Sequence, residues 1–117
     1  MSKIFVNYHK CSTCKRAEKF LKENNVEFVN RNIVEENPTA EELSLWMDKS
    51  GLEPRKFFNT SGVLYREMNL KDKIKTMSKE EMIEILSTNG MLVKRPLLVT
   101  EDIVLVGFKE ENYKEII

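Results

Sequence analysis

The sequence has only two cysteines and one histidine, and this scarcity limits the metal chemistry that it could support. A structural zinc site takes four ligands. Cys11, Cys14 and His9 would supply three at most, so a fourth would have to be a carboxylate or come from another chain. We therefore expect no bound metal and no other cofactor, although a zinc site of that composite kind stays open as an alternative.

The sequence also lacks an excess of either charge and lacks a long apolar stretch. Lys plus Arg and Asp plus Glu both number 19, so the formal net charge is zero. Proteins that bind nucleic acid directly carry an excess of Lys and Arg, so we expect no such partner. No run approaches the ~20 apolar residues that span a bilayer, and the first residues turn polar too soon for a signal peptide. We expect a cytoplasmic protein without a membrane partner.

What the sequence does contain is the composition of a globular protein, with 41% hydrophobic and 32% charged residues. Its length of 117 residues is that of one ordinary domain, and no repeat or linker divides it. We predict a single domain over residues 1–117. In a reducing cytoplasm, a lone Cys-x-x-Cys pair is more often catalytic, redox-sensing or metal-binding than structural.

The first part of the chain has the pattern of a βαβ unit. Residues 3–8 contain a short apolar block, which is typical of a strand covered on both faces. From Ser12 the apolar residues recur with helical spacing until Asn24 and Asn25. Residues 26–29 then predict a second strand.

The middle of the chain, roughly residues 36–90, predicts a helical insertion. Helix 39–51 ends at Gly51, a second helix extends to about residues 89–90, and a loop-like stretch lies around residues 54–62. Two capping boxes mark the helix starts: Thr39 with Glu42, and Ser78 with Glu81.

The last part predicts two strands and a helix. Residues 96–99 and 103–106 are short apolar runs, the pair Glu101-Asp102 between them suits a hairpin turn, and residues 109–117 predict a final helix. The order β-α-β, helical insertion, β-β-α is that of a thioredoxin-like α/β domain with a helical insertion between its two halves.

Cys11 and Cys14 stand where the first strand passes into the first helix. Backbone N–H groups at a helix start lack partners and stabilise an anion, and Lys10, Lys15 and Arg16 add positive charge nearby. Such surroundings lower a cysteine pKa from ~8.5 into the range ~3.5–7.5. Cys11 is therefore the predicted nucleophile, and Cys14, one helical turn on, is the predicted resolving thiol of a thiol–disulfide exchange.

Plainer interpretations of these residues stay open. The two thiols could be inert, since free cysteine often packs as a small hydrophobic residue. His9 could be a surface turn residue rather than a catalytic base. Pro96 could simply start a strand, and Arg95 before it could be a surface charge or could bind an oxyanion or the Cys11 thiolate.

Three segments together resemble the arsenate reductase (ArsC)/Spx family: Cys11-Ser-Thr-Cys14, LVKRPLLV at 92–99 and LVGFKEENYKEII at 105–117. The resemblance covers essentially the whole chain. It implies a thioredoxin-like fold, a cis peptide bond at Pro96, and an Arg95 side chain that faces the Cys11 loop. The residues expected to support the site are Ser12, Thr13, Lys15 and Pro96.

The family contains two functional types, and the chain matches each in part. Glutaredoxin-linked arsenate reductases use one nucleophilic cysteine, which matches Cys11, and three arginines, of which only Arg95 is matched. Asn59 and Gly107 fall where the other two are expected. Because each lost guanidinium removes charge-assisted hydrogen bonds worth roughly 1.5–3 kcal/mol each, we do not expect efficient arsenate reduction.

Spx-type regulators carry the Cys-x-x-Cys pair as a redox switch and bind the C-terminal domain of the RNA polymerase α subunit. Cys11, Cys14 and Arg95 match that pattern. The resemblance therefore implies either a thiol–disulfide redox protein served by a thiol reductant (glutaredoxin, thioredoxin or a small thiol), or a redox-switched partner of RNA polymerase. A redox-inert scaffold that keeps the fold is the third option.

Overall fold

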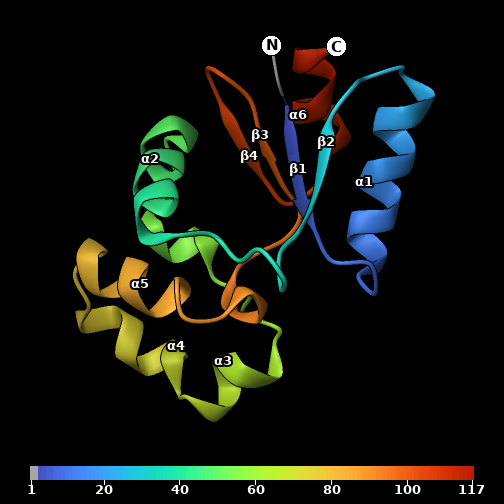
Figure 1. Cartoon of the computed structure of the whole chain (residues 1–117). Helices are drawn as coiled ribbons and strands as arrows, with labels where there is room; N and C mark the ends of the chain where they lie inside the picture. Colours follow the sequence, from blue (N-terminus) through green and yellow to red (C-terminus); the bar gives the residue numbers. More distant parts are fainter. Residues whose placement is uncertain (1–2) are drawn as a thin grey trace.

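The computed structural model describes residues 3–117, and a mixed four-stranded sheet forms its centre (Figure 1). The strands are β1 (Ile4–Asn7), β2 (Val29–Asn32), β3 (Leu97–Val99) and β4 (Val104–Val106), in the spatial order β2-β1-β3-β4. β1 pairs parallel with β2 and antiparallel with β3, and β3 pairs antiparallel with β4. This arrangement agrees with the predicted thioredoxin-like order of elements.

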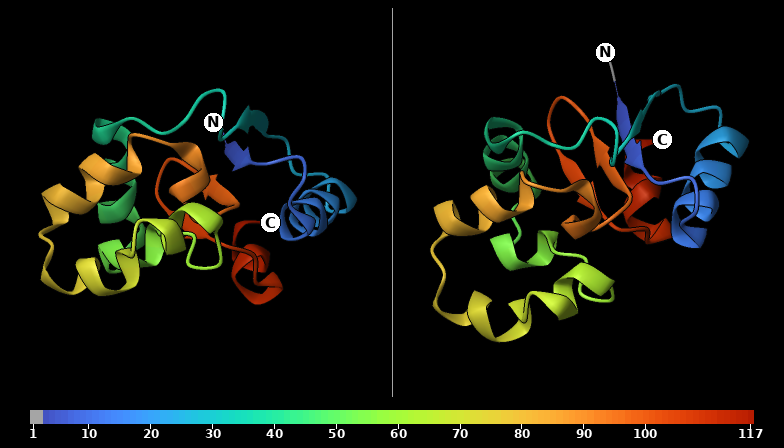
Figure 2. Two further views of the ribbon diagram at one scale, coloured as in Figure 1. Left: turned by 90° about the horizontal axis from the view of Figure 1, so that it is seen from below. Right: turned by 60° about the horizontal axis from the view of Figure 1, so that its bottom comes forward.

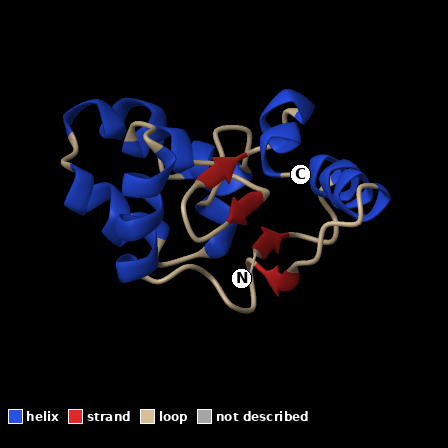
Figure 3. Cartoon of the chain, turned by 90° about the horizontal axis from the view of Figure 1, so that it is seen from above, coloured by secondary structure: helices blue, strands red, loops and turns tan. Residues whose placement is uncertain are grey.

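Successive side chains of a strand point to opposite faces of a sheet, and here they divide the core in two. Phe5 and Leu98 pack on one face with Tyr113 and with the apolar side of α1 (Ser12–Glu23). Val6 packs on the other face with the helical insertion. Figure 3 shows the strands between the insertion on one side and α1 with the C-terminal helix on the other.

The insertion consists of short helices that gather on one side of the sheet (Figure 2). Thr39 and Ser78 each cap a helix as predicted, accepting a hydrogen bond at 3.1 Å from the backbone N–H of Glu42 and Glu81 respectively. The α-helices are α2 (Ala40–Ser50), α3 (Val63–Glu67), α4 (Leu70–Lys73) and α5 (Lys79–Leu86), and the 3-10 turns are η1 (Pro54–Phe57), η2 (Ile74–Thr76) and η3 (Gly90–Leu92).

The second strand lies three residues later than predicted, at Val29–Asn32 instead of 26–29. Val26 and Phe28 bring their side chains against the core on the α1 face before strand pairing begins at Val29. Three of the four strand residues are polar, because β2 is an edge strand whose side chains reach other partners. Asn30, for example, accepts a hydrogen bond from Asn7 on β1.

Other elements also differ from the prediction. The stretch around residues 54–62 includes the turn η1, and α5 ends at Leu86 rather than at residues 89–90. The last helix is divided into α6 (Glu110–Tyr113) and η4 (Lys114–Ile116). Each difference lies in a short element whose extent depends on tertiary packing, which sequence periodicity does not report.

Arg31 links the edge strand β2 to helix α2 of the insertion through hydrogen bonds and a contact with an aromatic ring. Its Nη1 and Nη2 atoms donate hydrogen bonds to Glu42 Oε2 and Oε1 at 2.7 and 2.8 Å. Its guanidinium lies 5.6 Å from the centroid of the Trp46 ring, and its Nε donates to the carbonyl of Glu36 at 2.9 Å. The hydrogen bonds to Arg31 hold the pKa of Glu42 below its ordinary value.

Candidate functional site

Cys11 occupies the N-cap position of α1, directly after the turn that follows β1. Its backbone is extended, its N–H donates to the carbonyl of Tyr8 at 3.0 Å, and its carbonyl accepts the N–H of Lys15 at 3.1 Å. Its side chain makes no capping hydrogen bond, and the residue is partly exposed. The sulfur therefore sits at a helix start, where unpaired backbone N–H groups stabilise a thiolate.

Cys14 lies one turn further along α1 and is only 2% exposed. Both thiols are free. Burial is the largest influence on Cys14 and raises the pKa of its thiol to about 12, an effect that the neighbouring Cys11 reinforces. Cys14 is therefore held as a protonated thiol at neutral pH.

The surroundings of Cys11 act in the opposite direction. Partial burial by itself would raise the pKa of the Cys11 thiol, but the nearby backbone N–H and thiol of Cys14, together with the Arg95 guanidinium, lower it below its ordinary value. The predicted contribution of Lys10, Lys15 and Arg16 is not among these main causes. The positive charge that matters comes instead from a residue far along the chain.

Arg95 comes from the segment that leads into β3, and its peptide bond to Pro96 is cis, as the family resemblance implied. Its guanidinium lies 5.1 Å from the centroid of the Tyr8 ring, in the turn before Cys11. The Arg95 side chain therefore faces the Cys11 loop. Its Nε and Nη1 atoms are buried and have no hydrogen-bond partner within the described residues.

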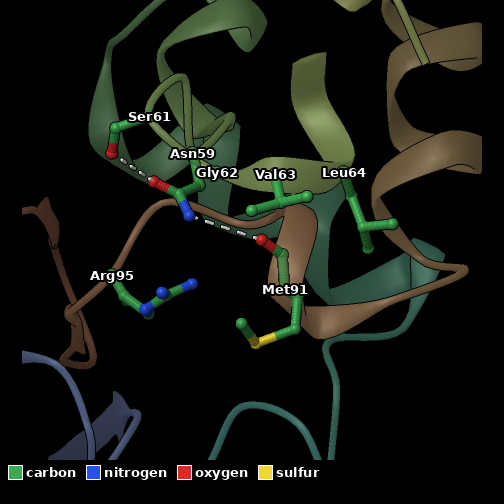
Figure 4. A pocket seen from close by; sticks show the side chains of 7 residues that line it. All are labelled: Asn59, Ser61, Gly62, Val63, Leu64, Met91 and Arg95. Carbon is green, nitrogen blue, oxygen red and sulfur yellow. Dashed lines mark hydrogen bonds between the residues drawn. The ribbon is translucent and has the colours of Figure 1, made fainter. Parts of the chain in front are cut away.

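A cavity of about 310 Å³ opens beside Arg95 (Figure 4). Asn59 Nδ2 donates to the carbonyl of Met91 at 3.5 Å, and Ser61 Oγ donates to Asn59 Oδ1 at 3.2 Å. The Arg95 side chain extends into the space between Asn59 and Met91. The lining residues are Asn59, Ser61, Gly62, Val63, Leu64, Met91 and Arg95.

Sequence reasoning identified only Asn59 and Arg95 among these lining residues. The other five, Ser61, Gly62, Val63, Leu64 and Met91, were missed, since no motif or spacing connects the segment 59–64 with position 91. The run Asn-Thr-Ser-Gly at 59–62 indicated a loop and nothing more. A cavity built from separate segments is visible only once the fold has brought them together.

Several other predicted residues lie at the edge of the site or away from it. Ser12 and Lys15 are exposed, and Thr13 accepts a hydrogen bond from Arg16 at 3.3 Å. His9 is also exposed, with its ring packed edge-on to Tyr8 at 5.0 Å between centroids. Gly107 adopts the left-handed conformation, with φ of 80°, and does not line the cavity. The supporting roles of Ser12, Thr13 and Lys15 stay predictions.

Metal-ligating side chains do not gather in residues 3–117, where no group of three or more His, Cys, Asp or Glu residues could hold an ion. Within the same residues, no helix has both the length and the apolar character needed to cross a bilayer.

A model of the ArsC family matches residues 7–116. The chain belongs to the ArsC family. Among known proteins it is similar to YusI of Bacillus subtilis, which is described as uncharacterized. The two are 49% identical over 115 residues, and the match covers 98% of each. The regulatory protein MgsR of the same bacterium is 29% identical over 106 residues, which covers 89% of this chain and 81% of MgsR.

Two solved structures of ArsC-type proteins confirm the fold. An ArsC family related protein from Bacteroides fragilis is 56% identical, with a TM-score of 0.98 and coverage of 100% of this chain and 98% of the other. A possible arsenate reductase from Streptococcus mutans UA159 is 40% identical, with a TM-score of 0.88 and coverage of 96% and 97%. The predicted thioredoxin-like α/β class is therefore confirmed.

Proposed function

We propose that this ArsC-family chain is a cytoplasmic thiol–disulfide redox protein in which Cys11 is the nucleophile and Cys14 the resolving thiol. The observation that carries the proposal is the contrast between the two sulfurs. Cys11 is partly exposed at a helix start beside Arg95, and its pKa is lowered. Cys14 is buried one turn away, and its pKa is raised. Only the outer sulfur is thus prepared to attack.

The exchange balances because the two electrons that reduce the substrate disulfide come from Cys11 and Cys14, which end as a disulfide. The Cys11 thiolate attacks one sulfur of a substrate disulfide, the substrate S–S bond breaks, and the released thiolate takes a proton from water. Cys14 then loses its proton and attacks the Cys11 sulfur, which forms the Cys11–Cys14 disulfide and releases the second substrate thiol. An external thiol reductant (glutaredoxin, thioredoxin or a small thiol) returns the two electrons.

Arsenate is a weaker candidate substrate for this site. Asn59 lines the cavity where the family resemblance leads one to expect an arginine, and its amide is already engaged with Met91 and Ser61. Gly107 offers no side chain at all. Among the described lining residues, Arg95 alone carries a positive charge, so a multiply charged oxyanion would be poorly neutralised.

The test is trapping of the mixed disulfide. Reduced wild-type protein should convert a small disulfide into two thiols and end with a Cys11–Cys14 disulfide, as intact-protein mass spectrometry would record. The variant Cys14→Ser should stop at a stable adduct on Cys11, and Cys11→Ser should react at the rate of an ordinary buried thiol. Equal reactivity of Cys11→Ser and wild type would remove the proposal.

A second function, of another class, follows from the relatives. MgsR is described as a regulatory protein, and several proteins described as the global transcriptional regulator Spx match, including one from Bacillus subtilis at 24% identity. On this alternative, Cys11 and Cys14 form a redox switch on a protein that binds the C-terminal domain of the RNA polymerase α subunit. Pull-down of that domain by the oxidised and by the reduced chain tests this alternative, because a regulator of this kind must bind the domain in at least one redox state.

A further inference from the structure

Two of the hydrogen-bond donors of Arg95 are buried and lack an acceptor within the described part of the chain. Its Nε and Nη1 atoms are shielded from solvent and donate to no acceptor in residues 3–117. A buried donor without an acceptor costs free energy, and more when the donor is charged. Arg95 also lines the cavity described above, so a ligand there would meet a guanidinium whose hydrogen bonding within the described residues is incomplete.

The cavity beside Arg95 has the size and lining of a small-molecule site. Its volume of about 310 Å³ lies at the lower end of the range typical for such sites. Val63, Leu64 and Met91 form an apolar wall, and Val63 is 59% exposed although it is a large hydrophobic residue. The polar side chains that line the cavity are the Asn59 amide, the Ser61 hydroxyl and the Arg95 guanidinium (Figure 4).

The charge of the cavity restricts the ligand further. Arg95 supplies one positive charge, and no other Lys, Arg or His and no Asp or Glu is among the described residues that line it. One guanidinium matches one carboxylate, both in charge and in hydrogen-bonding groups. Arg95 also contacts the Tyr8 ring, in the turn before Cys11, so the same side chain borders both the cavity and the turn that holds the nucleophile, although Cys11 is not among the residues that line the cavity.

We propose that the cavity binds the carboxylate end of a small disulfide substrate, with Arg95 holding the carboxylate and Val63, Leu64 and Met91 packing against its short hydrocarbon chain. This inference rests on the proposed thiol–disulfide function and adds the substrate class. The bound carboxylate directs the disulfide, a few bonds away, toward Cys11. The exchange then follows the balanced steps given above, with the carboxylate unchanged.

The experiment compares three disulfides of similar size and different charge: 3,3′-dithiodipropionate (anionic), bis(2-hydroxyethyl) disulfide (neutral) and cystamine (cationic). The comparison separates the effect of the substrate's charge from the intrinsic reactivity of its disulfide bond. Each reacts in a single turnover with reduced protein, so no external reductant is needed, and each rate constant is divided by that measured with a free model thiol. The normalised rate should be about tenfold or more higher for the anionic than for the neutral disulfide, as one charge-assisted contact provides.

Variants of Arg95 test whether this residue causes the preference for the anionic disulfide. In Arg95→Gln the ratio of anionic to neutral rates should fall to about one, whereas a general loss of thiolate reactivity would slow all three disulfides equally and leave the ratio unchanged. Arg95→Lys should keep part of the preference. Lys94→Gln is the matched control, because it removes the adjacent positive charge from an exposed residue that does not line the cavity, and it should keep the full ratio.

A binding measurement separates this inference from the proposed function. The thioether 3,3′-thiodipropionate cannot exchange, and it should shift the NMR amide signals of Asn59, Leu64 and Met91 in wild type but not in Arg95→Gln. If no disulfide reacts, the proposed redox function fails and this binding alone decides the cavity. The inference is overturned by an anionic-to-neutral ratio of one in wild type, by a ratio unchanged in Arg95→Gln, or by displacement of the thioether at lower concentrations of inorganic phosphate.

Discussion

Replacing Glu42 by Gln tests how the insertion is fastened to the sheet. The substitution keeps the size of the side chain but removes its charge and one of the oxygens that accept from Arg31 at 2.7 and 2.8 Å. Arg31 has a side chain only 14% exposed, while that of Glu42 is 33% exposed. The change therefore leaves a largely buried guanidinium with part of its hydrogen bonding lost.

The size of the effect follows from that partial burial. Exposed ion pairs contribute about 0.2–1 kcal/mol, and breaking a fully buried pair costs about 3–5 kcal/mol. A pair of intermediate exposure should lie between these limits, so we expect Glu42→Gln to lower the free energy of unfolding by about 2 kcal/mol. For a chain of this length, about 4 °C of melting temperature per kcal/mol makes the expected drop about 8 °C.

Glu41→Gln is the matched control. Glu41 also lies in the first turn of α2, so both substitutions lose a similar interaction with the helix dipole, worth about 0.3–1 kcal/mol. Glu41 is exposed and forms no ion pair within the described residues. The two variants, compared by urea unfolding at pH 7, should therefore differ by the contribution of Arg31 together with that of the Thr39 N–H, which also donates to Glu42 at 3.0 Å.

The pH dependence provides a second check on Glu42. Arg31 lowers the pKa of Glu42 in the folded state, so the stabilisation is complete above the unfolded pKa of about 4.3. It is lost as the pH falls through the lower, folded value. The gap between wild type and Glu42→Gln should narrow below about pH 4. The stabilising role of the Arg31–Glu42 pair would be contradicted if Glu42→Gln lost no more unfolding free energy than Glu41→Gln, or if its difference from wild type widened in acid.

Three further predictions concern the site and its supports. Arg95→Gln removes a donor and a charge that lower the pKa of Cys11, so the pH profile of Cys11 alkylation by iodoacetamide should move to higher pH; Lys94→Gln should leave it in place. Gly90→Ala would set a Cβ 1.8 Å from the carbonyl oxygen of Ile33, so urea unfolding should show a loss of at least about 2 kcal/mol, and a wild-type midpoint would contradict the close approach. Ser78→Ala removes a helix cap and should cost about 1 kcal/mol by the same measurement, whereas exposed Ser12→Ala should cost less.

The elements that sequence could predict are those fixed by their own residues. The helix starts at Thr39 and Ser78 were found because a capping box contains both partners within four residues. The strand β2 was misplaced because its polar residues are specified by distant partners. Arg31 in that strand donates hydrogen bonds to Glu42, and the pattern of apolar and polar residues at 29–32 cannot predict this contact.

The same distinction applies to the site. Cys11 and Cys14 could be found because they are three positions apart at a strand-to-helix junction, so local chemistry alone points to them. The source of the charge beside Cys11 could not be found in this way. Neighbouring lysines were the reasonable expectation, but the charge comes from Arg95, which the antiparallel pairing of β3 with β1 brings to the Cys11 turn.

Main-chain hydrogen bonds help to position the wall of the cavity opposite Arg95, in addition to the hydrogen bonds that the Asn59 side chain makes with Met91 and Ser61. The N–H of Lys94 donates to the carbonyl of Phe57 at 2.7 Å, and the N–H of Asn59 donates to the carbonyl of Leu92 at 2.8 Å. Any residue except proline at position 59 can make the second bond. This main-chain hydrogen bond therefore does not depend on whether the side chain at position 59 is an arginine or an asparagine. On the inference drawn above, the residue at position 59 thus bears on which anion the cavity accepts, because asparagine there leaves Arg95 as the one charged side chain among the described lining residues.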